Sequence, residues 1–354
     1  MKERMIDMSK RQLFCLTAMF LLLSALFSGC GAQHSSDHDV SFAVRDDLFG
    51  TVISITIHDD APESLLDLSF DAIEDIDIRM SVNRADSELS RLNANTSGTY
   101  AVSPDLFALL DNALTYSART NGTFDASIGA VSALWTAQGV FAVRPSDDDI
   151  SEKLPLVGFE QITLSDDGRT VYMPAGMRID LGAIAKGHAA DLVRDMLEEH
   201  GVRHAILYFG GDIYAVGTRP DGSNWRIAIT SPHLGDNDFA AIVEVSDAAV
   251  FTSGNYERFF EQNGVHYHHI LDPKTGFPAD SGLISVTVIS ASGITADALS
   301  TAGFIWGLEE GVRLLERLDG IEGIFITSDN RVYTTTGIRD AVTIASPAFT
   351  LGER

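Results

Sequence analysis

ISVTVIS (284–290) is followed, after three residues, by ITADALSTAGFIWG (294–307), and these two segments carry clear secondary-structure patterns. The β-branched residues of the first segment alternate with smaller ones, which predicts a strand. The Ala and Leu residues of the second segment predict a helix, with Thr295 as its N-cap. A strand that runs directly into a helix therefore stands at the centre of the expected fold.

The same helix carries oxygen ligands on one face. Asp297 and Thr301 are four residues apart and point the same way, with Ser300 beside them. Carboxylate and hydroxyl oxygens are the ligands that Mg²⁺ or Ca²⁺ accepts. An Asp near a helix start also complements the helix dipole, and Thr can bond its own backbone, so this segment by itself leaves both interpretations open.

The periodicity of the remaining chain predicts further strands and helices. Strands are expected at residues 51–58, 205–209, 212–217, 225–229, 241–246, 249–252, 265–271, 321–327 and 331–335. Helices are expected at residues 62–80, from Pro104 (N-capped by Ser103) to Asn121-Gly122, within 178–201 after a short strand that ends at 180–182, and near 309–318. Short strands with glycine-rich turns predict a single α+β domain with a mixed, largely antiparallel sheet and packed helices.

Composition narrows the classes of function. The chain has 354 residues, 45% of them hydrophobic, and a formal net charge of −25, so we expect a substantial core under a strongly acidic surface. Such a surface repels nucleic acid and anionic lipid headgroups, and no basic cluster follows the amino terminus. Nucleic-acid binding is therefore not expected.

The amino terminus reads as a secretory signal. Four basic residues precede an apolar run at 13–27, and small residues lead to Cys30, as in bacterial lipoprotein signals. We expect residues 1–29 to be a signal peptide, Cys30 to be lipidated, and residues 30–40 to form a polar tether. The alternative is an uncleaved anchor, and both place the domain at residues 41–350 outside the cytoplasm. With Cys15 as the only other cysteine, no disulfide is expected.

Two loops could approach a ligand closely. Asp125, Ala126 and Ser127 lie in NGTFDASIG (121–129), where glycines permit close contact, although a helix-ending turn also explains the segment. In IDLGAIAKGHA (179–189), Asp180 ends the expected strand before Gly182-Ala183, and Lys186 follows. This arrangement suits an ion pocket or an ordinary strand-to-helix connection, and no Walker A or G-x-G-x-x-G motif is present.

A turn and a group of histidines complete the candidates. The turn FGGD (209–212) suits either a ligand contact or a plain hairpin. In a strand, His266 and His268 face one side and His269 the other, and no cysteine remains to help, which disfavours zinc. His269 is better placed as a proton carrier or a ligand contact. The absence of G-x-S-x-G disfavours a serine hydrolase.

Taken together, these segments resemble the flavin transferase (ApbE) family, the FAD:protein FMN transferases. The resemblance covers nearly everything from residue 45 to residue 340. It runs in order through Phe49-Gly50-Thr51, MSVNRADSELSRLN (80–93), NGTFDASIG (121–129) with Leu134-Trp135, DLGAIAKG (180–187), FGGDIYAVG (209–217), TSGNYERFF (252–260), HHILDPKTGFP (268–278) and TADALSTAGF (295–304).

The resemblance implies a T-fold-like domain and a Mg²⁺-dependent enzyme that breaks FAD and esterifies FMN to a Thr or Ser of a partner protein. It implies metal ligands at Asp297, Thr301, the main-chain oxygen of Ala183 and Ser300, and a proton-transfer role for His269. It implies FAD contacts at Phe49, Asn83, Asp125, Ala126, Ser127, Asp180, Lys186 and Leu271. The implied partners are flavinylated extracytoplasmic subunits of membrane redox complexes, reached by an enzyme held at the cell membrane by its lipid.

Two positions depart from the family pattern. Phe49 stands where Met is common, a hydrophobic exchange that should preserve contact. Asn83 stands where Tyr is usual, which removes an aromatic surface worth about 1 kcal/mol from the cofactor pocket. Two alternatives to transfer therefore stay open, namely hydrolysis of FAD to FMN and AMP and simple flavin binding or storage.

Overall fold

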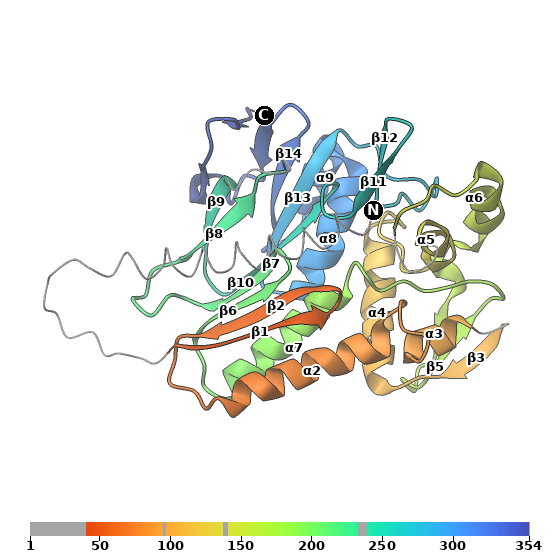
Figure 1. Cartoon of the computed structure of the whole chain (residues 1–354), viewed down its shortest axis with the longest axis horizontal. Helices are drawn as coiled ribbons and strands as arrows, with labels where there is room; N and C mark the ends of the chain where they lie inside the picture. The colour runs from red at the N-terminus through yellow and green to blue at the C-terminus, as the bar shows by residue number, and fades with distance from the viewer. Residues whose placement is uncertain (1–39, 95–96, 137–140, 233–238, 354) are drawn as a thin grey trace, which may run out of the picture. The chain divides into compact units, whose positions relative to one another are not determined.

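A nine-stranded sheet forms the centre of the protein (Figure 1). The computed structural model describes residues 40–94, 97–136, 141–232 and 239–353, and residues Asp39–Arg354 group as one compact unit. The strand order is β1-β2-β6-β7-β10-β13-β14-β15-β17, and only β15 and β17 pair in parallel. The expectation of a mixed, largely antiparallel α+β fold is confirmed.

Most strands of the large sheet follow the expected ranges closely, but the two edge strands, at Ser41–Leu48 and Thr350–Leu351, were not predicted. The strands of this sheet are β1 (Ser41–Leu48), β2 (Thr51–Ile57), β6 (His204–Phe209), β7 (Asp212–Gly217), β10 (Ala248–Gly254), β13 (Leu283–Ser290), β14 (Glu322–Thr327), β15 (Arg331–Thr334) and β17 (Thr350–Leu351). Smaller sheets contain β3 (Gly98–Ala101), β4 (Thr163–Leu164) and β5 (Thr170–Met173), then β8 (Trp225–Thr230), β9 (Phe239–Val245) and β16 (Val342–Ile344), and the hairpin β11 (Phe259–Gln262) and β12 (Val265–His268).

Three helices pack in series against one face of the sheet, with α7 between α2 and α8 (Figure 1). The helices are α2 (Ser64–Met80), α3 (Glu88–Asn93), α4 (Pro104–Arg119), α5 (Gly129–Trp135), α6 (Asp147–Lys153), α7 (Ala185–Glu199), α8 (Gly293–Trp306) and α9 (Leu308–Leu315), with 3-10 turns η3 (Leu154–Leu156), η4 (Phe159–Gln161) and η5 (Arg339–Ala341). Within the described residues, no helix is long and apolar enough to cross a membrane.

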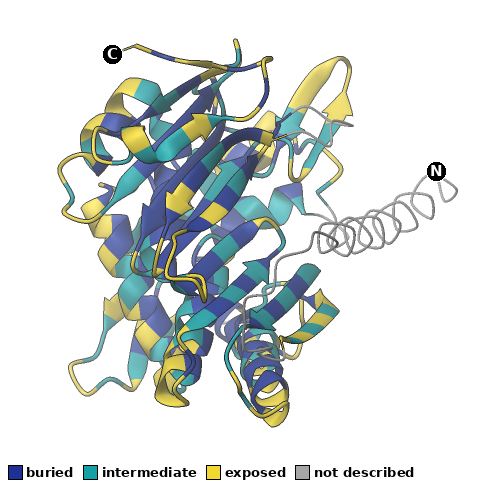
Figure 2. Cartoon of the chain, turned by 90° about the vertical axis from the view of Figure 1, so that its left-hand side faces the viewer, coloured by how far each residue is buried: buried dark blue, intermediate teal, exposed yellow. Residues whose placement is uncertain are grey.

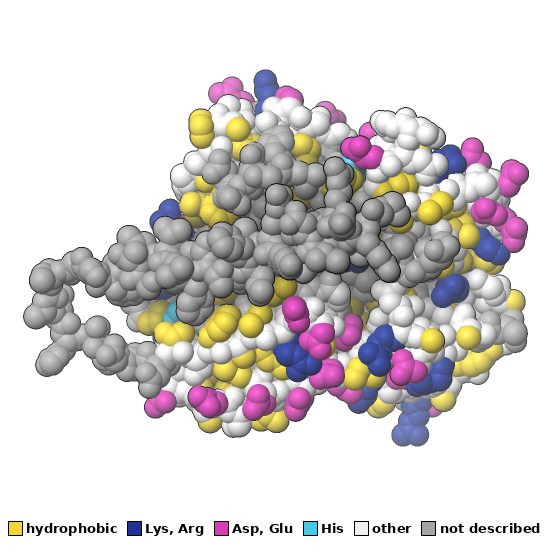
Figure 3. Space-filling model, viewed as in Figure 1, with side chains coloured by type: hydrophobic (Ala, Val, Ile, Leu, Met, Phe, Trp, Pro, Cys, Tyr) yellow, Lys and Arg dark blue, Asp and Glu magenta, His cyan; other side chains and the backbone are white. Residues whose placement is uncertain are grey.

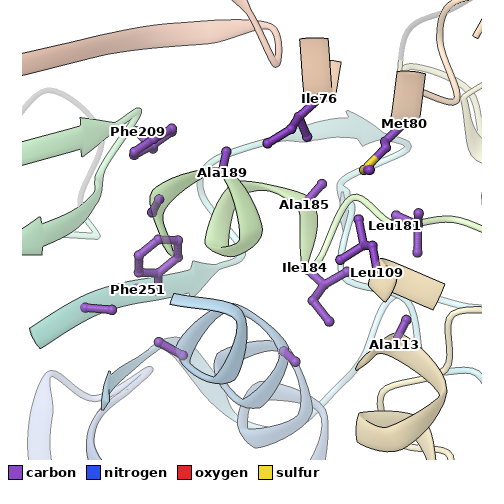
Figure 4. Close-up of a cluster of buried hydrophobic side chains, with 14 of the residues drawn as sticks. Ile76, Met80, Leu109, Ala113, Leu181, Ile184, Ala185, Ala189, Phe209 and Phe251 are labelled. Atoms are coloured by element: carbon purple, nitrogen blue, oxygen red, sulfur yellow. The ribbon is translucent and has the colours of Figure 1, made fainter. Parts of the chain in front are cut away.

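The largest hydrophobic cluster lies between these helices and the sheet, and buried residues run along the strands of the sheet (Figure 2). Figure 4 shows the small side chains of Ala185 and Ala189 on the side of α7 that faces Ile76 and Met80 of α2. Small residues on α7 allow this close approach. A second cluster lies between the large sheet and the β16-β9-β8 sheet, and a third surrounds Trp135.

Acidic side chains stand out along the lower rim of the visible face, over α2 (Figure 3). The helix carries five of them, Asp67, Asp71, Glu74, Asp75 and Asp77. This distribution agrees with the acidic surface that the composition predicts, and it does not favour a polyanionic partner.

Two local predictions were wrong. The N-cap of α8 is Ser292, whose hydroxyl accepts the Thr295 N–H, while the Thr295 hydroxyl is 2.5 Å from the Tyr116 hydroxyl. The expected strand at residues 178–182 is reduced to an isolated bridge between Arg178 and Ile128, because the chain turns at Leu181 to enter α7.

Candidate functional site

The site is built where α7 meets α8. The two helices approach closely because Gly187 faces Gly293, and a Cβ on Gly187 would lie 2.2 Å from the Gly293 carbonyl oxygen. The Gly187 N–H donates to the carboxylate of Asp297 at 2.9 Å. In a regular helix this N–H would donate to the carbonyl of Ala183, four residues earlier, so the Ala183 oxygen is left without that helical partner.

Asp297 is a buried carboxylate in the middle of these groups. Burial raises its pKa above the ordinary value, the charge of Lys186 lowers it, and the charge of Asp212 raises it again. Burying a carboxylate costs free energy unless a cation or hydrogen bonds compensate. The position is therefore one that an additional cation would stabilise.

The partly exposed Lys186 and the buried Asp212 form an ion pair beside Asp297. Burial alone would lower the pKa of Lys186, but the carboxylates of Asp212 and Asp297 outweigh it and raise this pKa. The other oxygen of Asp212 accepts the Thr252 N–H at 2.7 Å. Asp212 begins β7 after the Gly210-Gly211 turn, so the segment is a hairpin and also supplies a charged group to the site.

Hydroxyl groups surround Asp297 on the side of β10. The Ser253 hydroxyl is 2.8 Å from that of Ser300 and 3.2 Å from that of Thr301. Together with Asp297 and the carbonyl of Ala183, they form a set of hard oxygen donors that fits Mg²⁺. Among the described residues, no group of three His, Cys, Asp or Glu could hold a metal ion.

His269 follows β12 directly and is fixed by the main chain of Arg258. Its N–H donates to the Arg258 carbonyl oxygen at 3.1 Å, and its Nδ1 lies 3.2 Å from the same oxygen. A carbonyl oxygen can only accept, so Nδ1 carries the proton and Nε2 keeps its lone pair. Burial lowers the pKa of His269 to about 3, assisted by the positive charge of Arg258, so the imidazole is neutral.

The two expected flavin loops lie side by side. The Asp180 N–H donates to the Ala126 carbonyl at 2.8 Å, and the Gly129 N–H donates to the Arg178 carbonyl at 3.0 Å. Asp125 is a buried acceptor for the N–H and hydroxyl of Ser127, so both side chains are engaged within the loop. Burial raises the pKa of Asp125, against the hydrogen bonds from Ser127.

Asp180 connects this loop to the start of α7. One carboxylate oxygen accepts the Gly182 N–H at 2.9 Å, and the other accepts the Ser132 hydroxyl at 2.7 Å. The Asp180 N–H donates to the Ala126 carbonyl and the Asp180 carboxylate accepts the Gly182 N–H, so Asp180 links residues 125–129 to the segment that carries Ala183 and Lys186. Sequence-distant blocks that were expected to share a site are thus joined by main-chain contacts.

Three further expected residues form no hydrogen bond or ion pair with the groups around Asp297 within the described part of the chain. Phe49 forms the β1–β2 turn with Gly50, at φ 51°, and packs against the main core. Asn83 is exposed between α2 and α3, and its N–H donates to the Ser81 hydroxyl at 3.2 Å. Leu271 is buried in the cluster around Trp135. The predicted lipidation site, Cys30, and the predicted signal lie outside the described residues.

Sequence reasoning missed three polar residues of this site as individual participants, namely Asp212, Ser253 and Arg258. Each lay within a segment that was singled out, FGGD or TSGNYERFF. A possible signal for Asp212 was its position after two glycines, where the backbone turns tightly and a carboxylate begins the next strand. Nothing local marks Ser253, whose contact with α8 depends on the packing of that helix against β10.

The site contains the neutral His269, the cations Lys186 and Arg258, and a set of hard oxygen donors at the end of an antiparallel sheet. These groups define an α+β enzyme suited to a phosphate-containing substrate. Comparison with known proteins makes this class specific. The model of the ApbE family matches residues 49–325, and the chain belongs to this family.

Relatives and solved structures agree with this assignment. The chain is 36% identical to a protein of Treponema pallidum (strain Nichols) named FAD:protein FMN transferase, over 86% of this chain and 89% of that one. The Vibrio cholerae flavin transferase ApbE superposes with a TM-score of 0.75 at 30% identity, covering 85% of this chain and 99% of that one. The Pseudomonas stutzeri flavinyl transferase ApbE gives a TM-score of 0.76 at 30% identity, covering 87% and 98%.

Proposed function

We infer that this protein is an FAD:protein FMN transferase, which moves FMN from FAD to a Thr or Ser of a partner protein and releases AMP. The family membership and the relatives of that name support this activity. The observation within the site that carries it is the neutral His269, whose Nε2 is free to take a proton while Nδ1 is held by Arg258.

The reaction needs a nucleophile, a base and a stabilised leaving group. The acceptor hydroxyl oxygen attacks the FMN phosphorus, its proton goes to Nε2 of His269, and the bond between phosphorus and the bridging oxygen breaks. AMP leaves with that electron pair. Lys186, which already faces Asp212 and Asp297, contributes positive charge where the phosphates would lie.

We propose Asp297, Thr301, the Ala183 carbonyl and Ser300 as the residues that hold Mg²⁺. Bound there, the ion would neutralise phosphate oxygens during the bond exchange. The buried carboxylate of Asp297 supports this proposal, because a nearby cation would offset its cost of burial. Asp125, Ala126, Ser127 and Asp180 form the adjoining wall proposed for FAD, and Phe49, Asn83 and Leu271 are the further proposed FAD contacts.

We propose that the enzyme acts outside the cytoplasm, attached to the cell membrane through a lipid on Cys30. The basic region, apolar run and small residues before Cys30 support this proposal, with residues 30–40 as the tether and residues 41–350 as the transferase domain. The acceptors would then be extracytoplasmic subunits of membrane redox complexes that carry a Thr or Ser flavinylation motif.

Hydrolysis of FAD is the second candidate function, and the exposed Asn83 favours it. Where an aromatic residue would cover the flavin, Asn83 offers no stacking surface, so water has easier access to the phosphorus. A flavin-binding lipoprotein without turnover is the third candidate.

One assay separates these functions. The mature protein is incubated with FAD and Mg²⁺, with and without a partner that contains a D-x-x-[ST]-x-[AS]-[ST] motif. Flavin fluorescence on the denatured partner indicates transfer, AMP released without the partner indicates hydrolysis, and intact FAD indicates storage. We expect Asp297→Ala to lose both turnovers, and full activity of that variant would remove the metal assignment.

A further inference from the structure

Arg258 and His269 are cross-strand partners on one face of the β11–β12 hairpin. The register pairs Phe259 with His268 and Gln262 with Val265, so Arg258 and His269 are the next opposite pair. The hydrogen bond from the His269 N–H to the Arg258 carbonyl, at 3.1 Å, continues this register. Directly opposite residues share a face with their Cβ atoms about 5 Å apart, so the guanidinium emerges beside the imidazole.

The Arg258 side chain is exposed, and it differs from the other cation of the site. The partly buried ammonium of Lys186 is already paired with the carboxylate of Asp212. Within the part of the chain that the structure describes, Arg258 has no carboxylate at salt-bridge distance. An exposed guanidinium beside a catalytic base is free to receive an anion, and its planar fork matches two phosphate oxygens.

The positive charge of Arg258 also disfavours protonation of His269. Burial lowers the pKa of His269 most, followed by the charge of Arg258, then by His268 and Lys186, while the bond to the Arg258 carbonyl raises it. The unloaded site therefore opposes a proton on Nε2. An anion on the guanidinium would cancel part of this repulsion and would make His269 a better base.

We propose that the Arg258 guanidinium binds phosphate oxygens of the FAD diphosphate, and that this contact makes His269 ready to accept the acceptor's proton only when the substrate is present. This inference rests on the proposed function. The anion contact itself makes and breaks no covalent bond. In the transfer step it assists, the acceptor O–H bond breaks as the Nε2–H bond forms, and phosphorus exchanges the bridging oxygen of AMP for the acceptor oxygen. The charge of Arg258 would thus limit proton transfer to His269 in the enzyme without substrate.

Binding of nucleotides without metal tests the contact. In EDTA, we expect ADP to bind the mature protein at least tenfold more weakly in Arg258→Ala than in the unchanged protein, since a charge-assisted phosphate contact is lost, while adenosine binding stays equal. The ADP affinity of Arg258→Lys should lie between those of Arg258→Ala and the unchanged protein, because lysine keeps the charge without the planar fork of the guanidinium. Arg226→Ala is the matched control, since Arg226 is exposed and its nearest carboxylate, on Glu244, is 3.9 Å away. Equal ADP affinity in Arg258→Ala, or no ADP binding by the unchanged protein, would overturn the contact.

The ring protons of His269, followed by NMR during a pH titration, test the coupling. In the unchanged protein His269 should titrate at higher pH with ADP than without it. In Arg258→Ala, His269 should titrate at higher pH than in the unchanged protein even without ADP, and addition of ADP should no longer shift its titration. A response to ADP of the same size in both proteins would overturn the coupling. If FMN transfer is absent while these differences appear, the proposed function is wrong and the anion contact stands; if transfer is normal in Arg258→Ala, the inference is wrong and the function stands.

Discussion

The contact between α7 and α8 gives the sharpest test of how the fold holds the site. Replacement of Gly187 by Ala places a Cβ 2.2 Å from the Gly293 carbonyl oxygen and 2.8 Å from the Ile294 nitrogen. Both neighbours are backbone atoms at the start of α8, so no side-chain rotation can relieve the overlap. Since carbon–oxygen contacts are rarely shorter than about 3.3 Å, the two helices would have to separate by about 1 Å.

That separation acts directly on the site. The Gly187 N–H to Asp297 bond is 2.9 Å long, and a shift of about 1 Å takes it beyond hydrogen-bonding distance. Overpacking costs about 1–3 kcal/mol, and loss of a hydrogen bond to a charged group costs about 1.5–3 kcal/mol. A helical Ala returns up to about 1 kcal/mol, so we expect the free energy of unfolding to fall by roughly 2–5 kcal/mol.

Urea unfolding and AMP release from FAD measure the two effects. Gly303→Ala is the matched control in α8, because its Cβ would meet side chains and no backbone, with Val286 at 3.2 Å and Phe325 at 3.8 Å. We expect the control to change stability by less than about 1 kcal/mol and to keep its turnover. Gly187→Ala should lose turnover even where it is fully folded. If it matches the control in both measurements, the close approach does not hold Asp297 in place.

Three further outcomes are expected. Burial lowers the pKa of His268 to about 4, so the native state binds fewer protons than the unfolded chain between pH 4 and 6.5. As the pH falls through this range, the free energy of unfolding of the unchanged protein should decrease by up to about 3 kcal/mol relative to that of His268→Gln. A constant difference between the two unfolding free energies would contradict the assignment. Asn83→Tyr should tighten FAD about fivefold in a fluorescence titration and lower the ratio of hydrolysis to transfer, whereas an unchanged ratio would show that Asn83 does not control water. Chelation should abolish turnover and Mg²⁺ should restore it, because the proposed donors are hard oxygens; full turnover in EDTA would exclude the metal.

Much of the fold could be predicted because its elements have strong local patterns. The strand at 212–217 and the helix that Ser103 caps at Pro104 agree with the structure, since alternation, a proline at the first helical position and a capping hydroxyl are local properties. The edge strand β1 (Ser41–Leu48) was missed, because its charged and polar residues weaken the alternation. Its place in the sheet comes from pairing with β2 instead.

The start of α8 shows why other features could not be predicted. Thr295 has the right chemistry for an N-cap, but the helix begins earlier because Asp191 of α7 accepts the N–H groups of Gly293 and Ile294. Ser292 caps the Thr295 N–H and donates to the same carboxylate. A tertiary contact therefore fixes a boundary that local propensity would place elsewhere.

The same reasoning explains which site residues were found. Asp297 and Thr301 share a helix face, so their proximity follows from spacing alone. The approach of Asp212 to Lys186 requires the pairing of β7 with β10 and the packing of α7, which no local pattern shows. The partnership of Arg258 with His269 depends on the register of a hairpin whose loop had not been recognised.

Helix α8 packs into the hydrophobic core and also carries polar residues of the site, and these two roles have opposite effects on stability. Most of its residues are buried, and its apolar side chains stabilise the main cluster, yet Asp297 and Ser300 are buried among them. A carboxylate at such a depth is unfavourable by itself, and the Gly187 N–H and the Lys186 ammonium only partly compensate for it. The proposed cation and an anionic substrate would relieve the remaining cost by entering together, because each would neutralise the charge that the other leaves in a low dielectric. Bound substrate should thus stabilise the α7–α8 contact, and changes in that contact should alter folding stability and catalysis together.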